Sequence, residues 1–205
     1  MTLQKWIKDR AIHGYPTFSI EDVRNTGMYS SEQILQNELS RLCANKTIAN
    51  VYRGFYVIFP VHYILRGSIP ASYYIDQMMS YLGKPYYVCM LSAAEHLGAA
   101  HQRPQQFSLM TTFPKRRVVS TRNVTIDWFY RDRLPEEAFI IKNTETGTIR
   151  ISNPLLTAAD LIQYQQHVGG LSRVATILEE LAEQMDIRNQ FRLIMSYVKT
   201  VTWQR

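Results

Sequence analysis

The stretch from Tyr29 to Pro60 constrains the fold of this chain more than any other. Its leucines recur at helical spacing and predict one apolar stripe along a helix from Ser31 to Ala44. Two runs rich in β-branched and aromatic residues follow, Thr47 to Tyr52 and Phe55 to Phe59, and the Arg53-Gly54 pair between them predicts a hairpin. An amphipathic helix followed at once by a basic hairpin is typical of a winged helix-turn-helix.

Two shorter amphipathic segments precede this stretch and predict two more helices. The first runs from Thr2 to His13, and the second from Ser19 to about Asn25. Gly14 and Pro16 separate them, as expected for a loop between helices. We therefore expect residues 1–66 to form a winged helix-turn-helix domain that binds double-stranded DNA.

The polar face of the Ser31–Ala44 helix and the hairpin supply the expected DNA contacts. Gln33, Gln36 and Asn37 carry amides that can pair with a base edge, above all that of adenine. Positively charged side chains of the helix and hairpin are better suited to phosphates. The predicted DNA-binding set is Ser31, Gln33, Gln36, Asn37, Ser40, Arg41, Lys46 and Arg53.

Residues 67–205 predict a larger domain of mixed α+β class. Ile69-Pro70 is a junction, because the residue before a proline disfavours helix. A helix is expected over Ala71–Leu82, strands at about 105–151, and helices at about 154–203, the last two over Leu171–Met185 and Ile187–Trp203. The whole chain is therefore predicted to be α+β, with a helical C-terminal tail.

The net charge of +6 is unevenly distributed. Residues 1–66 carry +3 and residues 101–150 carry +4, while residues 151–205 are neutral. The densest basic cluster comprises Lys115, Arg116, Arg117 and Arg122. This cluster either binds phosphates or an acidic partner, or is a solvated turn, and the sequence leaves both readings open. Arg131 and Arg133 flank Asp132 and suggest an exposed turn.

Catalytic and metal-binding motifs are not apparent in the sequence. Cys89, His96 and His101 match no common zinc spacing, so no metal or other cofactor is predicted. An alternative to the DNA-binding regulator is a nucleic-acid-processing enzyme or subunit, with Asp127, Lys142 and Glu145 on a nuclease-like middle sheet. A third reading is an adaptor whose winged helix binds protein.

No apolar run approaches the length of a membrane span, and the first ten residues are charged and amphipathic rather than a signal peptide. Cys43 and Cys89 are the only cysteines; Cys43 lies late in an amphipathic helix and Cys89 in an apolar run, which favours buried thiols over a disulfide. We therefore expect a cytoplasmic protein with no membrane partner.

Four features of the chain together resemble the AbiEi family. They are the winged helix with its VYRGFYVIFP hairpin, the segment YYVCMLSAAEHLGAAHQRP from Tyr86 to Pro104, the basic strands, and the helix entry at Asn153-Pro154. Members of this family are antitoxin-type transcriptional regulators. The Tyr86–Pro104 segment is the most family-like part, because winged helices in general lack it.

The resemblance implies a non-enzymatic protein that binds operator DNA upstream of its own operon through Ser31–Arg41 and Lys46–Arg53. It also implies a C-terminal domain that counteracts a nucleotidyltransferase-type toxin in abortive infection, a phage defence. Whether the toxin is bound directly or antagonised indirectly stays open. Family members tend to continue with more helix beyond a position like Gln204-Arg205, so a shortened C-terminus is also left open.

Overall fold

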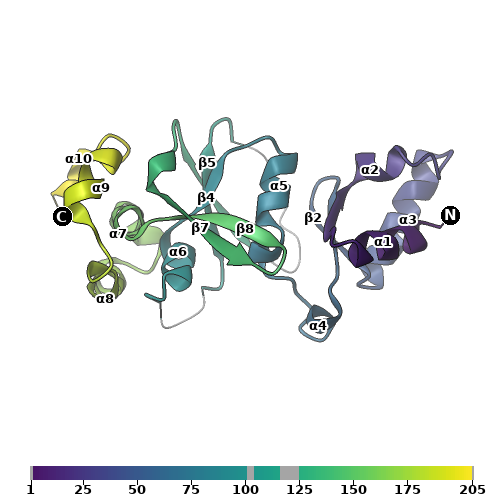
Figure 1. The fold of residues 1–205 in the computed structure, drawn as a ribbon, viewed down its shortest axis with the longest axis horizontal. Helices are drawn as coiled ribbons and strands as arrows, with labels where there is room; N and C mark the ends of the chain where they lie inside the picture. Colours follow the sequence, from purple (N-terminus) through teal and green to yellow (C-terminus); the bar gives the residue numbers. More distant parts are fainter. Residues whose placement is uncertain (1, 101–103, 116–124, 205) are drawn as a thin grey trace. The chain divides into compact units, whose positions relative to one another are not determined.

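The computed structural model describes residues 2–100, 104–115 and 125–204, and its architecture is mixed α+β, as the sequence predicts. The described residues form two compact units that divide between Gly83 and Lys84 (Figure 1). The helix expected at Ala71–Leu82 belongs to the first unit, since Tyr81 stacks on Phe55 with ring centroids 5.1 Å apart. The division of function at residue 66 stays a prediction.

The first unit contains helices packed on a small antiparallel sheet of strand order β1-β3-β2. Its elements are α1 (Leu3–Ile12), β1 (Thr17–Ser19), α2 (Ile20–Arg24), α3 (Glu32–Ala44), β2 (Ile48–Tyr52), β3 (Phe55–Ile58), α4 (Val61–Ile64), the 3-10 turn η1 (Ala71–Tyr73) and α5 (Ile75–Tyr81). The three N-terminal helices and the β2–β3 hairpin lie where the sequence predicts them, whereas β1 was not expected.

Local capping explains where these helices begin and end. Ser19 and Asp22 form a reciprocal capping box at the start of α2, in which each side chain accepts the other residue's backbone amide. Ser31 is the N-cap of α3, but its side chain makes no capping bond. The end of α3 is closed by two turn bonds, from the amides of Lys46 and Thr47 to the carbonyls of Cys43 and Leu42.

The second unit is built on a mixed five-stranded sheet of order β6-β5-β4-β8-β7. Its elements are β4 (Tyr86–Val88), α6 (Met90–His96), β5 (Phe107–Thr112), β6 (Ile126–Arg131), η2 (Glu136–Ala138), β7 (Phe139–Thr144), β8 (Gly147–Ser152), α7 (Pro154–Gln163), η3 (Gln165–His167), α8 (Leu171–Ala182), α9 (Ile187–Ile194) and α10 (Thr200–Trp203). β4 pairs antiparallel with β5 and parallel with β8, β5 pairs parallel with β6, and β7 and β8 form an antiparallel hairpin.

Helices α6 and α7 pack together against the sheet, and α8 and α9 pack on α7 (Figure 1). The helix entry at Asn153-Pro154 is confirmed: Pro154 opens α7, and the Asn153 side chain accepts the Leu156 amide at 2.8 Å. The buried core includes Met90, Ala94, Met110 and Leu156. This core holds α6 against β5.

Two expectations about the second unit are wrong. The sheet begins earlier than residue 105, because Tyr86–Val88 forms its central strand β4. The helix expected over Ile187–Trp203 is broken between α9 and α10. There the Tyr197 carbonyl accepts a bond from Arg131 Nη1 at 3.1 Å, and the Lys199 amide donates to Gln163 Oε1 at 3.2 Å. These tertiary bonds replace the helical ones.

The expectation that Arg131 lies in an exposed turn is also wrong, because Arg131 lies in the core. Its side chain is 7% exposed and forms an ion pair with Asp160, which is fully buried. The Tyr87 hydroxyl donates to the other carboxylate oxygen of Asp160 at 2.9 Å. This buried network joins β6, α7, β4 and the segment before α10, so it holds the second unit together through charge as well as apolar packing.

Candidate nucleic-acid interface

Helix α3 has one buried face and one exposed polar face. Leu35, Leu39 and Leu42 are 1–2% exposed and pack in the core of the first unit. The polar face carries the predicted base-reading and phosphate-binding side chains Gln33, Gln36, Asn37, Ser40 and Arg41, all exposed. Ser31 is half-buried at the helix start. The fold therefore brings most of the predicted DNA-binding set onto one surface.

These polar side chains also bond to one another at the i,i+4 spacing of a helix. Gln33 Nε2 donates to Asn37 Oδ1 at 3.1 Å, and Gln36 Nε2 donates to Glu32 Oε1 at 2.9 Å. Such exposed bonds have small net energies and can be exchanged for bonds to a ligand. The amides are therefore oriented along the helix surface and remain available to a partner.

Two carboxylates on α3 make its surface less positive than its sequence suggested. Glu32 accepts hydrogen bonds from Arg24 of α2, which lower the pKa of Glu32, and Gln36 adds to this shift. Glu38 pairs with Arg41 at 2.7 Å, and the hydrogen bond from Arg41 lowers the pKa of Glu38. The positive charge of Arg41 is thus partly offset by the carboxylate of Glu38. The role of Arg24 was missed, because its partner Glu32 lies eight residues away across a turn.

Lys46 and Arg53 are exposed at the two ends of the β2–β3 region. Lys46 adopts the left-handed conformation, with φ of 53°, although it is not a glycine. In the hairpin, Gly54 has φ of 72°, and a Cβ there would lie 3.2 Å from Ile20 and from the Tyr81 hydroxyl. Glycine at 54 therefore permits the tight turn that displays Arg53.

The second basic cluster is described only in part. Lys115 is exposed and lies 5.8 Å from the ring centroid of Tyr130. Arg116, Arg117 and Arg122 lie outside the described residues. Both readings of this cluster, a site for phosphates or an acidic partner and a solvated turn, therefore stay open.

The residues suggested for a nuclease-like site are not brought together. Asp127 lies on β6, whereas Lys142 lies on β7 and Glu145 in the turn after it. β6 and β7 are the opposite edges of the five-stranded sheet, with three strands between them. At about 4.8 Å per strand, the edges are roughly 19 Å apart. Across the described residues there is likewise no cluster of three His, Cys, Asp or Glu side chains placed to hold a metal.

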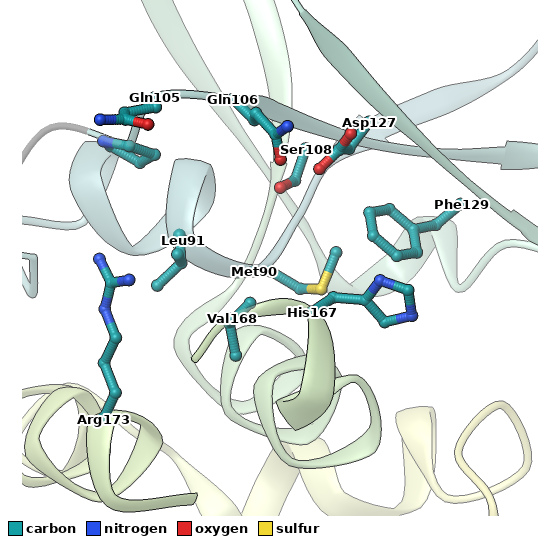
Figure 2. Close-up of a pocket in the computed structure, with 11 residues that line it drawn as sticks. Met90, Leu91, Gln105, Gln106, Ser108, Asp127, Phe129, His167, Val168 and Arg173 are labelled. Atoms are coloured by element: carbon teal, nitrogen blue, oxygen red, sulfur yellow. The ribbon is translucent and has the colours of Figure 1, made fainter. Parts of the chain in front are cut away.

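A pocket of about 460 Å³ in the second unit was not anticipated from the sequence. It lies between the starts of β5 and β6, the first turn of α6 and the turn between α7 and α8 (Figure 2). Its lining comes from four separate segments of the chain, so no local sequence motif predicts it. The polar lining residues are Gln105, Gln106, Ser108, Asp127, His167 and Arg173.

Residues 86–205 match the family model of the AbiEi antitoxin C-terminal domain, so the second unit has the sequence of an antitoxin domain. Because the match spans more than half of the chain, this protein belongs to the AbiEi antitoxin family. The resemblance seen in the sequence is confirmed.

A solved structure with the same fold is the crystal structure of the RV2827C protein from Mycobacterium tuberculosis. It is 13% identical with a TM-score of 0.67, and the match covers 97% of this chain and 72% of that one. None of the curated proteins matches the chain. In the part of the chain that the structure describes, no helix has both the length and the apolar character to cross a membrane.

Proposed function

We propose that this chain is a transcriptional repressor and antitoxin. Its first unit acts as a winged helix-turn-helix that binds operator DNA of its own operon, and its second unit counteracts a nucleotidyltransferase-type toxin. The observation that carries the DNA-binding half is the α3 surface, where the predicted base-reading amides are exposed opposite a fully buried leucine stripe. The exposed Arg53 at the tip of the β2–β3 hairpin supports it.

In this proposal α3 enters the major groove. Its 13 residues extend about 20 Å at about 1.5 Å per residue, enough for part of the helix to follow a groove about 12 Å wide. Gln36 and Asn37 exchange their bonds along the helix for bonds to a base edge. Arg41, Lys46 and Arg53 contact phosphates and fix the register. The protein then acts in the cytoplasm, without a cofactor or catalytic residues.

The antitoxin half is supported by membership of the AbiEi antitoxin family, whose model covers residues 86–205. A toxin is accordingly the expected protein partner, and its class as a nucleotidyltransferase is part of the proposal. Co-expression of this chain with the toxin tests this half through rescue of growth. Retention of the toxin on the purified chain then separates direct binding from indirect antagonism, because indirect antagonism gives rescue without retention.

The DNA-binding half is tested by a gel shift against the upstream region of the operon, with a scrambled duplex of equal length as competitor. We expect specific retention that weakens as salt rises, since phosphate contacts release counterions. Replacing Gln36 or Asn37 by Ala should cost about 1–3 kcal/mol of discrimination for each lost bidentate base contact. Gln4→Ala on α1, an exposed amide outside this surface, is the matched control.

Arg53→Ala should weaken binding to all duplexes alike and lower the slope of log K against log salt by about 0.9. Lys8→Ala removes an equal charge from the exposed side of α1 and controls for a general loss of charge. Equal binding of operator and scrambled duplex would reject the operator-reading proposal. Unchanged DNA affinity after combined Arg41→Ala and Arg53→Ala substitution would favour an adaptor that binds protein.

A further inference from the structure

The pocket of the second unit combines groups of opposite character at its two ends (Figure 2). Its volume of about 460 Å³ is in the range of small-molecule sites, which are mostly about 300–1,000 Å³. All of its lining residues lie between Met90 and Arg173, within one compact unit. The pocket therefore shares no residue with the proposed DNA-binding surface, which belongs to the first unit, and what it binds can be tested without DNA.

One end of the pocket has a carboxylate beside an aromatic pair. Asp127 is the register partner of Ser108 on the neighbouring strand, so both line the same wall. The rings of Phe129 and His167 lie edge to face, with centroids 5.4 Å apart and planes at 89°. Burial raises the pKa of Asp127, and the nearby His167 opposes this shift. This end thus offers hydrogen-bond acceptors next to a surface on which a planar ring can lie.

The other end has the guanidinium of Arg173, which Figure 2 shows on the far side of Leu91 from Asp127. The stem of Arg173 packs against Gly169, where a Cβ would lie only 3.2 Å from the arginine Cδ. Gly169 and Gly170 have φ of +94° and +90°, a conformation that glycine adopts without strain. This pair of glycines lets Arg173 lie close to the α7–α8 turn, where its planar fork is suited to phosphate.

The remaining lining joins these two ends. Met90, Leu91 and Val168 supply apolar contacts, and Gln105 and Gln106 supply exposed amides at the rim (Figure 2). Met90 is fully buried and has a left-handed φ of 50°, a strained conformation of the kind that clusters at ligand sites. A simple anion would meet Asp127, and a simple cation would meet Arg173. The lining therefore fits a ligand with hydrogen-bond donors at one end, a planar ring and an anion at the other.

We infer that this pocket binds a nucleoside monophosphate, with the base between Asp127 and the Phe129–His167 pair and the phosphate at Arg173. Guanine is the preferred base, because its edge presents two adjacent donors to the two oxygens of one carboxylate. Adenine presents one donor beside an acceptor and satisfies only one of those oxygens.

Calorimetric titration of the full chain tests this inference with GMP, AMP, guanosine and inorganic phosphate as separate probes. We expect saturable binding of GMP, with guanosine and AMP each about tenfold or more weaker, since each lacks one charge-assisted contact. Arg173→Gln should bring GMP down to the affinity of guanosine and leave guanosine unchanged. Asp127→Asn should abolish the preference for GMP over AMP.

The matched controls are Arg133→Gln and Asp132→Asn, which remove the same charges from exposed positions outside the pocket. Thermal unfolding of each variant shows whether it is folded. The inference is overturned if no nucleotide binds saturably up to about 10 mM, beyond the millimolar range of weak ligands. It is also overturned if phosphate alone binds as tightly as GMP, or if the wild-type chain binds GMP and AMP equally. A third contrary result is a loss of GMP affinity in Arg133→Gln as large as that in Arg173→Gln.

Discussion

Two ion pairs, one in each unit, differ in how far water reaches them. In the first unit, the ion pair between Arg24 and Glu32 is exposed, with side chains 40% and 52% accessible. In the second unit, the pair between Arg131 and Asp160 is enclosed, at 7% and 0%. Water and salt screen the exposed pair, so its members can change partners at little cost. The enclosed pair is shut off from solvent, and its remaining partners are the Tyr197 carbonyl and the Tyr87 hydroxyl of the same unit, so it serves the fold and not a ligand.

Breaking the enclosed pair should give the largest effect in this comparison. Asp160→Asn leaves the Arg131 charge buried and uncompensated, which typically costs about 3–5 kcal/mol in free energy of unfolding. Burial alone would lower the pKa of Arg131, but the Asp160 carboxylate raises it above its ordinary value, so Arg131 stays charged. Chemical denaturation measures the loss.

The exposed neighbour provides the control for this substitution. Asp132→Asn removes an equal charge one residue after Arg131 and should change stability by no more than about 0.5 kcal/mol. Replacing both partners, as Arg131→Met with Asp160→Leu, should recover part of the loss, because no buried charge remains. An Asp160→Asn protein as stable as Asp132→Asn would mean that the pair is not enclosed.

Tyr87→Phe should have the next largest effect. It removes the hydroxyl that donates to Asp160 at 2.9 Å and leaves one carboxylate oxygen with a lost partner. A buried hydrogen bond to a charged group contributes about 1.5–3 kcal/mol. We expect a loss in this range in chemical denaturation, smaller than for Asp160→Asn. A loss of stability larger than that of Asp160→Asn would indicate that Tyr87, and not Arg131, is the main stabilising partner of Asp160.

The sequence predicted the first unit better than the second for a physical reason. The leucine stripe of α3 and the Arg53-Gly54 hairpin depend on contacts between near neighbours, which a periodic pattern records. β1 escaped prediction because three buried residues give no alternation to detect. The DNA-binding side chains could be proposed because they lie on one helix.

The second unit depends on contacts between distant residues. Arg131 lies in the sequence Arg-Asp-Arg, which suggests solvent, and only its partner Asp160, 29 residues later, makes burial favourable. The pocket likewise draws on β5, β6, α6 and the start of α8. Such sites could not be predicted locally, whereas the family resemblance of Tyr86–Pro104 was visible because it resides in one continuous segment.

Lys46 offers a way to separate stability from binding within the first unit. Its left-handed φ of 53° costs a non-glycine residue about 1 kcal/mol. Lys46→Gly should therefore raise the free energy of unfolding by up to about 1 kcal/mol, yet lower the salt slope of DNA binding by about 0.9. Lys46→Ala should lower the slope equally without the gain in stability. If Lys46→Gly left DNA binding unchanged, Lys46 would not contact phosphate.

Glu32→Gln should give the smallest loss of stability of these substitutions. Unlike the loss of Lys46, it should strengthen DNA binding. Hydrogen bonds from Arg24 lower the pKa of Glu32, so the pair stabilises the fold above the ordinary pKa of glutamate. This stabilisation is lost as the pH falls through the lowered pKa of the folded state. Because the pair is exposed, the loss should be slight and should fade in high salt.

In DNA binding, Glu32→Gln removes a negative charge from the α3 surface and leaves Arg24 with Glu21 as its one remaining carboxylate partner among the described residues. We therefore expect tighter binding to all duplexes and a steeper dependence on salt in the gel shift. Glu179→Gln on α8 makes the same charge change on an exposed side chain of the second unit and should leave both unchanged. Weaker binding by Glu32→Gln alone would instead assign Glu32 a direct role, as the acceptor that orients Gln36 for its base.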